Sequence, residues 1–141
     1  MLAAASVIVD VALARARELA LAPLTVAVLD AGGHMKAIKR EDGSGIIREN
    51  IAIGKAWGAL GMGFPSRALA ERAAKGPQFF AALQAMSGGR VVPAAGGVLV
   101  RNGSGRLLGA VGVTGDTSDK DEECAVAGIR AAGLTAETGA A

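Results

Sequence analysis

The sequence contains few of the side chains on which most catalytic and metal sites depend. Among its 141 residues there is one cysteine, one histidine, one tryptophan and no tyrosine. A single cysteine, Cys124, excludes a disulfide within the chain and fits a reducing compartment. A single histidine, His34, excludes a pair of catalytic histidines and a histidine-based metal cluster within one subunit. The acidic residues and Cys124 match no zinc or calcium spacing.

Long apolar runs and strong charge are also missing. No apolar run approaches the roughly 20 residues that a membrane-spanning helix needs. The N-terminal stretch MLAAASVIV has no basic start and is soon followed by Asp10, so we expect no signal peptide. The net charge is +2, with basic and acidic residues interspersed, which argues against nucleic-acid binding. We therefore expect a cytoplasmic protein that binds neither membrane nor nucleic acid.

Small residues dominate what is present. Hydrophobic residues make up 51% of the chain, and there are 21 glycines. A core of alanine, glycine and valine lets helices and strands approach closely but buries little area per residue. Burial between subunits would then add stability, so we expect a homo-oligomer. The length favours one domain, covering residues 1–141.

The segment TVAVLDAGGHMKAIKRED, residues 25–42, predicts a β-hairpin. Strands near 24–30 and 34–40 flank Ala31-Gly32-Gly33, and glycine adopts a positive φ without steric cost. Asp30 is interpreted as a turn residue that bonds its own backbone. His34 lies where the loop meets the second strand. We expect this hairpin to form the centre of an antiparallel sheet and one edge of a binding site.

The remaining pattern completes an α+β domain. Helices are predicted at residues 4–21, 47–62, 67–75, 77–86 and 118–132. Ser66 is the expected N-cap of the third helix, and Ser118-Asp119-Lys120-Asp121 the expected cap of the last. A short strand at 91–92 and a hairpin of 98–101 with 107–114 follow, and the tail after Gly133 is expected to fray. The result is an antiparallel sheet of about five strands flanked by helices.

Two glycines lie on one face of the second helix. Gly54 and Gly58 are four residues apart, and each costs up to about 1 kcal/mol relative to alanine in a helix interior. The preferred interpretation is close packing of this face on the sheet or on another helix. The alternative is space for a flat ligand beside the helix.

Four segments in order carry a resemblance to a known family: LTVAVLDAGGHMKAIKRED, IAIGKAWGALGMGFPS, GGRVVPAAGGVLV and GAVGVTGDTSDKDEECAVAG. Over nearly the whole chain they resemble the GlcG/HbpS family, formerly a domain of unknown function. The resemblance implies a profilin-like α/β/α fold and assembly into homo-oligomers, with octamers among known members. Some relatives bind haem, including the PduO C-terminal domain, and others belong to catabolic operons without a settled activity. It therefore implies haem as a candidate cofactor but does not decide the function.

Four residues are candidates for ligand binding. His34 is a candidate haem-iron ligand, general base or, when protonated, carboxylate partner; the alternative is a turn residue bonded to a backbone carbonyl. Thr114 offers a hydroxyl and is the second candidate for a contact to haem iron. Lys55 either extends to solvent or anchors an anion, and its place in IAIGKA favours the anchor through the resemblance. Arg40 belongs to a charged strand end, interpreted as a solvated face or subunit contact with substrate binding as the alternative.

Two further groups are weighed as reactive residues. Asp121 and Glu122 are candidates for a general acid and base, but their place in the first turn of a helix explains both more simply. Cys124 follows this acidic turn, which opposes thiolate formation, and we expect it to be buried and inert.

Two functions follow from these observations. The first is an oligomeric small-molecule- or haem-binding accessory protein of a catabolic pathway. Its ligand would lie near the first hairpin and the glycine-rich strand, with His34 or Thr114 as the polar contact and Lys55 as the anion partner. The alternative is a cofactor-independent isomerase, lyase or hydrolase acting on a small carboxylic acid, with His34 moving the proton and Lys55 or Arg40 holding the substrate carboxylate. A protein scaffold ranks third.

Overall fold

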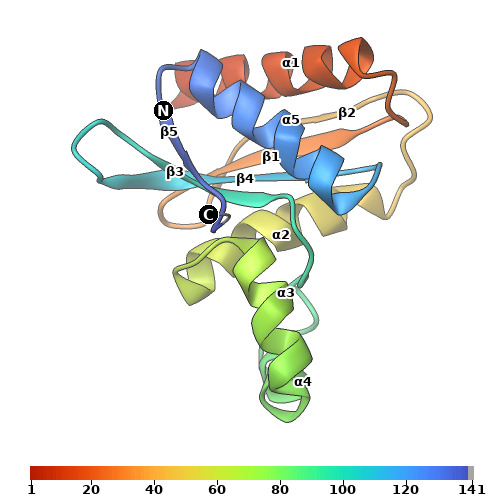
Figure 1. Ribbon diagram of the computed structural model, residues 1–141, viewed down its shortest axis with the longest axis vertical. Coiled ribbons are helices and arrows are strands. Elements are labelled where there is room, and N and C mark those ends of the chain that lie inside the picture. The colour runs from red at the N-terminus through yellow and green to blue at the C-terminus, as the bar shows by residue number, and fades with distance from the viewer. Residues whose placement is uncertain (140–141) are drawn as a thin grey trace.

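A five-stranded antiparallel sheet lies between two layers of helices (Figure 1). The computed structural model describes residues 1–139. The strands are β1 (Thr25–Asp30), β2 (Met35–Arg40), β3 (Gly97–Arg101), β4 (Leu107–Thr114) and β5 (Thr135–Glu137), and their order in the sheet is β2-β1-β4-β3-β5. The helices are α1 (Leu2–Glu18), α2 (Arg48–Met62), α3 (Ser66–Lys75), α4 (Pro77–Met86) and α5 (Ser118–Ala131). The predicted α+β class and sheet of about five antiparallel strands are confirmed. The expectation that the first hairpin forms the centre of the sheet is wrong, because its second strand, β2, lies at an edge.

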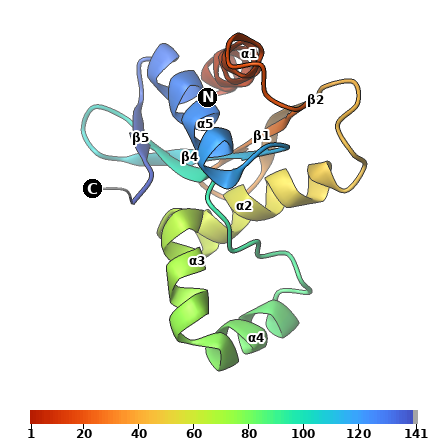
Figure 2. The same ribbon diagram turned by 45° about the vertical axis from the view of Figure 1, so that its right-hand side comes forward.

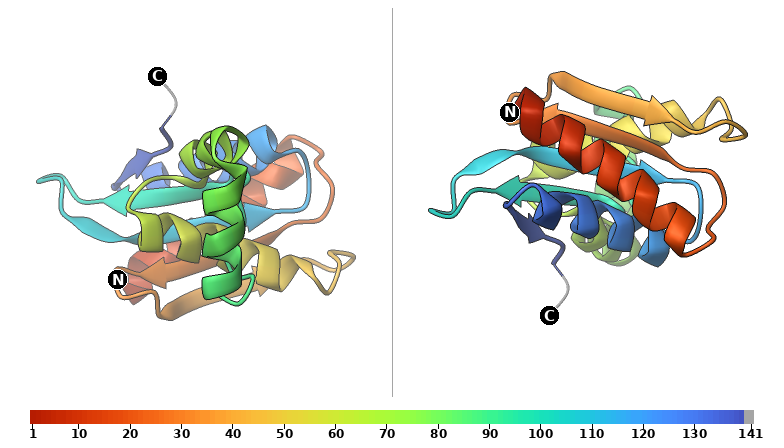
Figure 3. Two further views of the ribbon diagram at one scale, coloured as in Figure 1. Left: turned by 90° about the horizontal axis from the view of Figure 1, so that it is seen from below. Right: turned by 90° about the horizontal axis from the view of Figure 1, so that it is seen from above.

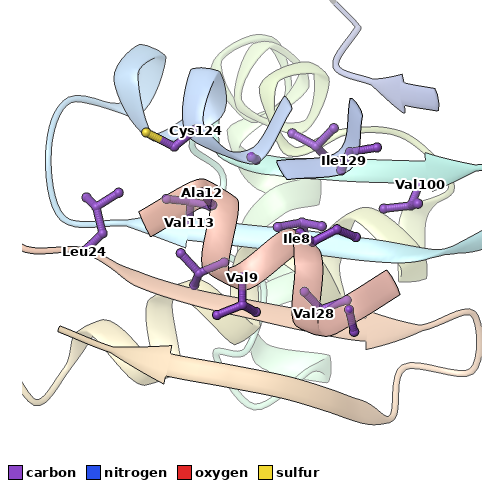
Figure 4. Packing of buried hydrophobic residues seen from close by; sticks show 14 of the residues in the cluster. Ile8, Val9, Ala12, Leu24, Val28, Val100, Val113, Cys124 and Ile129 are labelled. Carbon is purple, nitrogen blue, oxygen red and sulfur yellow. The ribbon is translucent and has the colours of Figure 1, made fainter. Parts of the chain in front are cut away.

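The main core lies between the sheet and the helices α1 and α5, which run side by side across it (Figure 3). Alternate residues of a strand point to the same face, so one set of valines from the two central strands points toward these helices. Val28 and Val113 from the sheet meet Ile8 of α1 and Ile129 of α5 in this layer (Figure 4). A smaller cluster on the other face places Leu29, Leu99 and Ala110 against α2.

Glycines in the sheet allow α2 to lie close to the strands. A Cβ added at Gly112 of β4 would overlap the Ala52 carbonyl of α2, and one added at Gly97 of β3 would overlap the Lys55 carbonyl. No larger residue fits at either position without moving the helix. The backbone of α2 therefore packs directly on β3 and β4 at these two glycines, and a ligand does not fit between the helix and the strands there.

The face of α2 that carries Gly54 and Gly58 is closely packed, as the preferred interpretation predicts. Its partner, however, is neither the sheet nor another helix. Gly54 and Gly58 contact the segment Arg90–Val92, since a Cβ at Gly54 would overlap the Arg90 carbonyl and one at Gly58 would lie 3.0 Å from Val91 Cγ1. These glycines lie on the side of α2 opposite the alanines that face the sheet. The strand predicted at 91–92 is therefore wrong, because α2 separates this segment from the sheet.

The fifth strand is instead the tail that was expected to fray. Thr135–Glu137 pairs with β3, with Arg101 opposite Thr135 and Leu99 opposite Glu137. Arg101 Nε also donates to Glu137 Oε1 at 2.6 Å. The tail is too short and too weakly patterned to predict a strand, and it forms one because β3 would otherwise have an unpaired edge.

The end of α1 and the cap of α5 differ from the predictions. α1 ends at Glu18 because Ala20 takes a left-handed φ of 53° and Leu21 N–H bonds the Ala16 carbonyl, which closes the turn before residue 21. α5 is capped by the Thr117 side chain, one residue earlier than the predicted Ser118. None of the helices within residues 1–139 is long and apolar enough to cross a membrane.

Ser66 does not cap α3, whose N-cap position is Pro65. Its hydroxyl donates to the Ala94 carbonyl at 2.6 Å and accepts from the Gly97 N–H at 2.7 Å. The side chain therefore fixes the chain as it enters β3. The helices α3 and α4 form an arm that projects from the side of the domain that α2 covers (Figure 2).

Candidate functional site

The loop between β1 and β2 is organised by one carboxylate. Asp30 Oδ1 accepts the backbone N–H of Gly32 and of His34, both at 3.0 Å, and lies 3.2 Å from His34 Nδ1. The Gly33 N–H donates to the Asp30 carbonyl at 2.9 Å, and Gly33 takes a positive φ of 83°. The predictions of a glycine-dependent hairpin and of an aspartate that bonds its own turn are confirmed.

This arrangement places the Asp30 carboxylate against one ring nitrogen of His34, Nδ1. The His34 N–H lowers the pKa of Asp30, as does the Gly32 N–H, so the carboxylate stays ionised. An ionised carboxylate only accepts hydrogen bonds, so its contact with the ring is a hydrogen bond when Nδ1 carries the proton. The His34 side chain is 81% exposed, and its Nε2 is available to a metal or a proton donor. The ring contacts the Asp30 carboxylate of its own turn, where the alternative had expected a backbone carbonyl.

His34 lines a pocket of about 390 Å³. The pocket joins the start of α1, the β1–β2 loop, the β3–β4 hairpin and the segment after α5. Its residues are Met1, Ala4, Asp30, Ala31, Gly32, His34, Arg106, Leu107, Leu108 and Leu134. Most of the lining is apolar, and Arg106 adds a cation to it. A flat apolar ligand that carries carboxylates suits this combination.

Sequence reasoning identified His34 but missed Arg106 and the leucines of the pocket. Their positions follow from the pairing of β1 with β4, which sets Asp30 opposite Gly109 and brings the β3–β4 hairpin to the His34 loop. The strand order was the missing information, and nothing in the local pattern around Arg106 indicates it.

The other candidates for ligand binding lie at the opposite end of β1. Thr25 begins this strand and is paired with Arg40 on one side and Thr114 on the other. His34 follows the far end of the strand, about 17 Å away at roughly 3.3 Å per residue. The expectation of one site that combines His34 with Lys55, Arg40 or Thr114 is therefore wrong within a single subunit.

Lys55 neither extends to solvent nor presents its ammonium to a ligand. It is 3% exposed, and Nζ donates to the Val113 carbonyl at 2.8 Å and to Asp121 Oδ2 at 3.3 Å. Burial lowers the pKa of Lys55, and the attraction of Asp121 opposes that shift. The anion that Lys55 holds is thus a carboxylate of its own chain.

Thr114 and Arg40 are also bound internally. Thr114 is 1% exposed, and its hydroxyl accepts from Arg48 Nη1 at 2.8 Å. Arg40 Nη1 donates to the Ser44 carbonyl at 2.7 Å. Both side chains hold the loop that leads from β2 to α2. Thr114 therefore fits a contact to haem iron less well than His34.

Asp121 and Glu122 contact different partners despite being adjacent in sequence. Asp121 Oδ1 accepts the Asp116 N–H at 3.0 Å, just ahead of α5, while Glu122 accepts from Arg67 Nε of α3 at 3.1 Å. Burial raises the pKa of Asp121, and Lys55 opposes this. Asp121 thus bonds the turn ahead of its own helix, whereas Glu122 joins α5 to α3, a partner that the simpler interpretation did not include.

Cys124 is buried, as expected, with no exposed surface. Burial raises the pKa of its thiol to about 11, and Asp121 and Glu123 add to the shift. Across residues 1–139, no three histidine, cysteine or acidic side chains come together as a metal site.

Known structures share this fold along most of the chain. The PduOC:haem complex has a TM-score of 0.83 and 25% sequence identity, and the match covers 92% of each chain. Protein ORFY of Klebsiella pneumoniae, assigned to family DUF336, has a TM-score of 0.84 and 25% identity, covering 94% of this chain and 90% of that one. A double mutant of HbpS from Streptomyces reticuli has a TM-score of 0.78 and 29% identity, covering 92% and 84%.

The sequence comparisons give one result for the family and none among curated proteins. No curated protein has a sequence that matches this chain significantly. The family described as "Haem degrading protein HbpS-like" matches residues 1–130, which spans every helix and strand except the last residue of α5 and the edge strand β5. The expected resemblance is confirmed, and this chain belongs to the HbpS-like family.

Proposed function

We propose that this protein binds haem in the pocket beside the β1–β2 loop, with His34 Nε2 as the ligand of the iron. The observation that carries the proposal is an exposed imidazole whose Nδ1 is held by Asp30 at the mouth of an apolar pocket. Histidine is a common axial ligand of haem iron. The family description and the PduOC:haem complex among the similar structures support the choice of haem.

The residues of the pocket suit the parts of a haem. Leu107, Leu108 and Leu134 offer apolar contact to a porphyrin face. Arg106 offers a guanidinium to a propionate carboxylate. Bound haem would supply an iron whose redox potential and oxygen chemistry depend on its axial ligand and on the polarity of the pocket.

A haem titration followed by absorbance tests this proposal. The wild-type chain is compared with His34→Ala, and Thr114→Val serves as the control because it removes the other candidate hydroxyl while keeping the side-chain shape. We expect a saturable Soret shift in the wild type and in T114V, with loss of the shift in H34A. A shift that survives in H34A but disappears in T114V would move the iron contact to the other end of the sheet. A non-saturating response in all three proteins would rule out haem as the ligand.

A homo-oligomer is part of the same proposal, and α4 is its interface. This helix of ten residues buries none of them in its own chain, and it exposes Phe79 at 68% and Met86 at 79%. Isolated helices shorter than about 12–15 residues are only marginally stable in water. The sequence PQFFAALQAM carries no charge, so two copies would meet along it without repulsion, as a symmetric interface requires. An accessory role in a catabolic pathway, in the cytoplasm, remains part of the proposal.

The alternative of a cofactor-independent enzyme is not proposed. It requires His34 to move a proton while Lys55 or Arg40 holds the substrate carboxylate. These residues lie at opposite ends of β1 and Lys55 is already paired with Asp121.

A further inference from the structure

We propose that Asp30 and Gly32 are positioning residues that set the protonation and orientation of His34 before any ligand arrives. The carboxylate holds the proton on Nδ1, and the absence of a side chain at Gly32 lets the ring lie over the loop, so that Nε2 is left as a lone-pair donor. The consequence for iron rests on the proposed function. The state of the imidazole itself is a property of the ligand-free chain.

The carboxylate is fixed by the same bonds that fold the loop. Asp30 Oδ1 accepts two backbone N–H groups at 3.0 Å in addition to facing His34 Nδ1 at 3.2 Å. Rotation of the carboxylate away from the ring would leave both N–H groups without this acceptor. Lys36 Nζ lies 3.8 Å from the second oxygen, Oδ2, and adds only a weak attraction at this exposed position. The acceptor for Nδ1–H is therefore preorganised.

Gly32 is the second part of the arrangement. A Cβ added there would lie 2.9 Å from both Nδ1 and Cε1 of His34 and 3.4 Å from Asp30 Oδ1. The ring therefore lies over position 32, and any other residue there would push it away from the carboxylate. Gly32 is absent from the residues with positive φ, so alanine suits its backbone and tests the close approach of the ring alone.

The expected effect on a bound metal follows from how such pairs act elsewhere. A histidine that donates its second N–H to a carboxylate is held in one tautomer and is a more basic ligand. Loss of such a partner typically lowers metal affinity by about 10–100-fold. Asp30 would then affect haem through His34 without touching it.

The direct test is the tautomer of His34 in the ligand-free protein. Because this is the only histidine of the chain, long-range ¹H–¹⁵N NMR of the imidazole at alkaline pH reports it without ambiguity. We expect Nδ1–H with unprotonated Nε2 in the wild type, and loss of this preference in both Asp30→Ala and Gly32→Ala. Lys36→Ala is the matched control and should leave the tautomer unchanged. Backbone amide spectra show whether each variant keeps its fold.

Two outcomes would overturn the inference. One is a wild-type ring protonated on Nε2. The other is Nδ1–H retained in both folded variants, since neither the carboxylate nor the bare glycine would then decide the state of the ring.

Haem titration of the same variants separates this inference from the proposed function. If haem binds through His34, we expect an affinity loss of about 10–100-fold in D30A and G32A and none in K36A. Equal haem binding by the wild type and H34A would remove the proposed function, while the tautomer result would stand. Haem binding that requires His34 but is unchanged in D30A and G32A would remove the inference and leave the proposed function intact.

Discussion

Lys55 Nζ lies 3.3 Å from Asp121 Oδ2, with the two side chains 3% and 1% exposed. The pair joins α2 on one face of the sheet to the first turn of α5 on the other, beside the end of β4 (Figure 1). Lys55 also donates to the Val113 carbonyl of that strand. Both charges are removed from water, so each depends on the other for compensation.

Removal of one member of this pair should be strongly destabilising. Lys55→Met or Asp121→Asn alone leaves an uncompensated charge in the interior and should cost about 3–5 kcal/mol. The double variant should cost clearly less than the sum of the two, because it removes both charges. Urea unfolding followed by circular dichroism gives the three values. Strictly additive losses would show that the two side chains do not compensate each other.

Glycine at position 112 should be required for α2 to pack on the sheet. Gly112→Ala places a Cβ against the Ala52 carbonyl and should cost at least about 1–3 kcal/mol, as overpacking does. Gly61→Ala is the control, since a Cβ there meets nothing within 4 Å and the helix gains up to about 1 kcal/mol in propensity. Thermal unfolding of both variants compares them directly. Equal midpoints for G112A and the wild type would contradict the close approach of α2.

Cys124 should not react while the protein is folded. Burial raises the pKa of its thiol to about 11, so the thiolate is scarce at about pH 8 and the sulfur is also inaccessible. A disulfide reagent that releases a coloured thiol should label the urea-unfolded chain within minutes and the native chain only as it opens. Rapid stoichiometric labelling of the native protein would show that α5 is not packed as described.

The ionised carboxylate of Asp116 should stabilise the folded state at pH values above its ordinary pKa of 3.8. The Ala22 and Thr117 N–H groups hold the pKa of its carboxyl below the ordinary value of 3.8. The folded state then binds its proton less readily than the unfolded state, so this contribution is present above 3.8 and is lost as pH falls toward the lowered pKa.

The Asp116→Asn variant isolates that contribution. The stability difference between the wild type and D116N should be larger at about pH 6 than at about pH 3, as measured by urea unfolding. Asparagine keeps an acceptor for the Ala22 N–H, so the loop should remain in place. A difference that does not change with pH would assign the role of Asp116 to its hydrogen bonds rather than to its charge.

A charge placed on α4 should dissociate the proposed oligomer. Phe79→Glu puts a carboxylate in the exposed apolar face of this helix and should lower the molar mass measured by light scattering to that of the 14.0 kDa chain. Ala14→Glu adds the same charge to an exposed position of α1 and should leave the mass of the oligomer unchanged. A wild-type chain that is already monomeric would contradict the interface on α4.

Features formed by neighbours in sequence were predictable. The glycine-dependent loop of the β1–β2 hairpin and the role of Asp30 depend on hydrogen bonds between residues at most four positions apart. In each case the local pattern contains both partners, so the physical cause is visible in the sequence.

Features formed by distant partners were not predictable. Ser66 has the residue type of a helix cap, yet its hydroxyl bonds the backbone at Ala94 and Gly97. Val91 and Val92 have the composition of a strand, but they lie on the glycine face of α2, away from the sheet. Both predictions are wrong because tertiary packing supplies another partner. For Ser66 this partner is the backbone at Ala94 and Gly97, and for Val91 and Val92 it is the glycine face of α2.

By itself the sequence determined the α+β class, the first hairpin and the presence of one imidazole at its loop, because periodicity and turn chemistry act over a few residues. Only the tertiary structure decided that Lys55 meets Asp121, 66 positions away, and that His34 shares a pocket with Arg106 rather than with Thr114. The reason is strand order: β4 lies beside β1 and brings two distant segments to opposite ends of that strand. Neither local propensity nor spacing encodes that pairing.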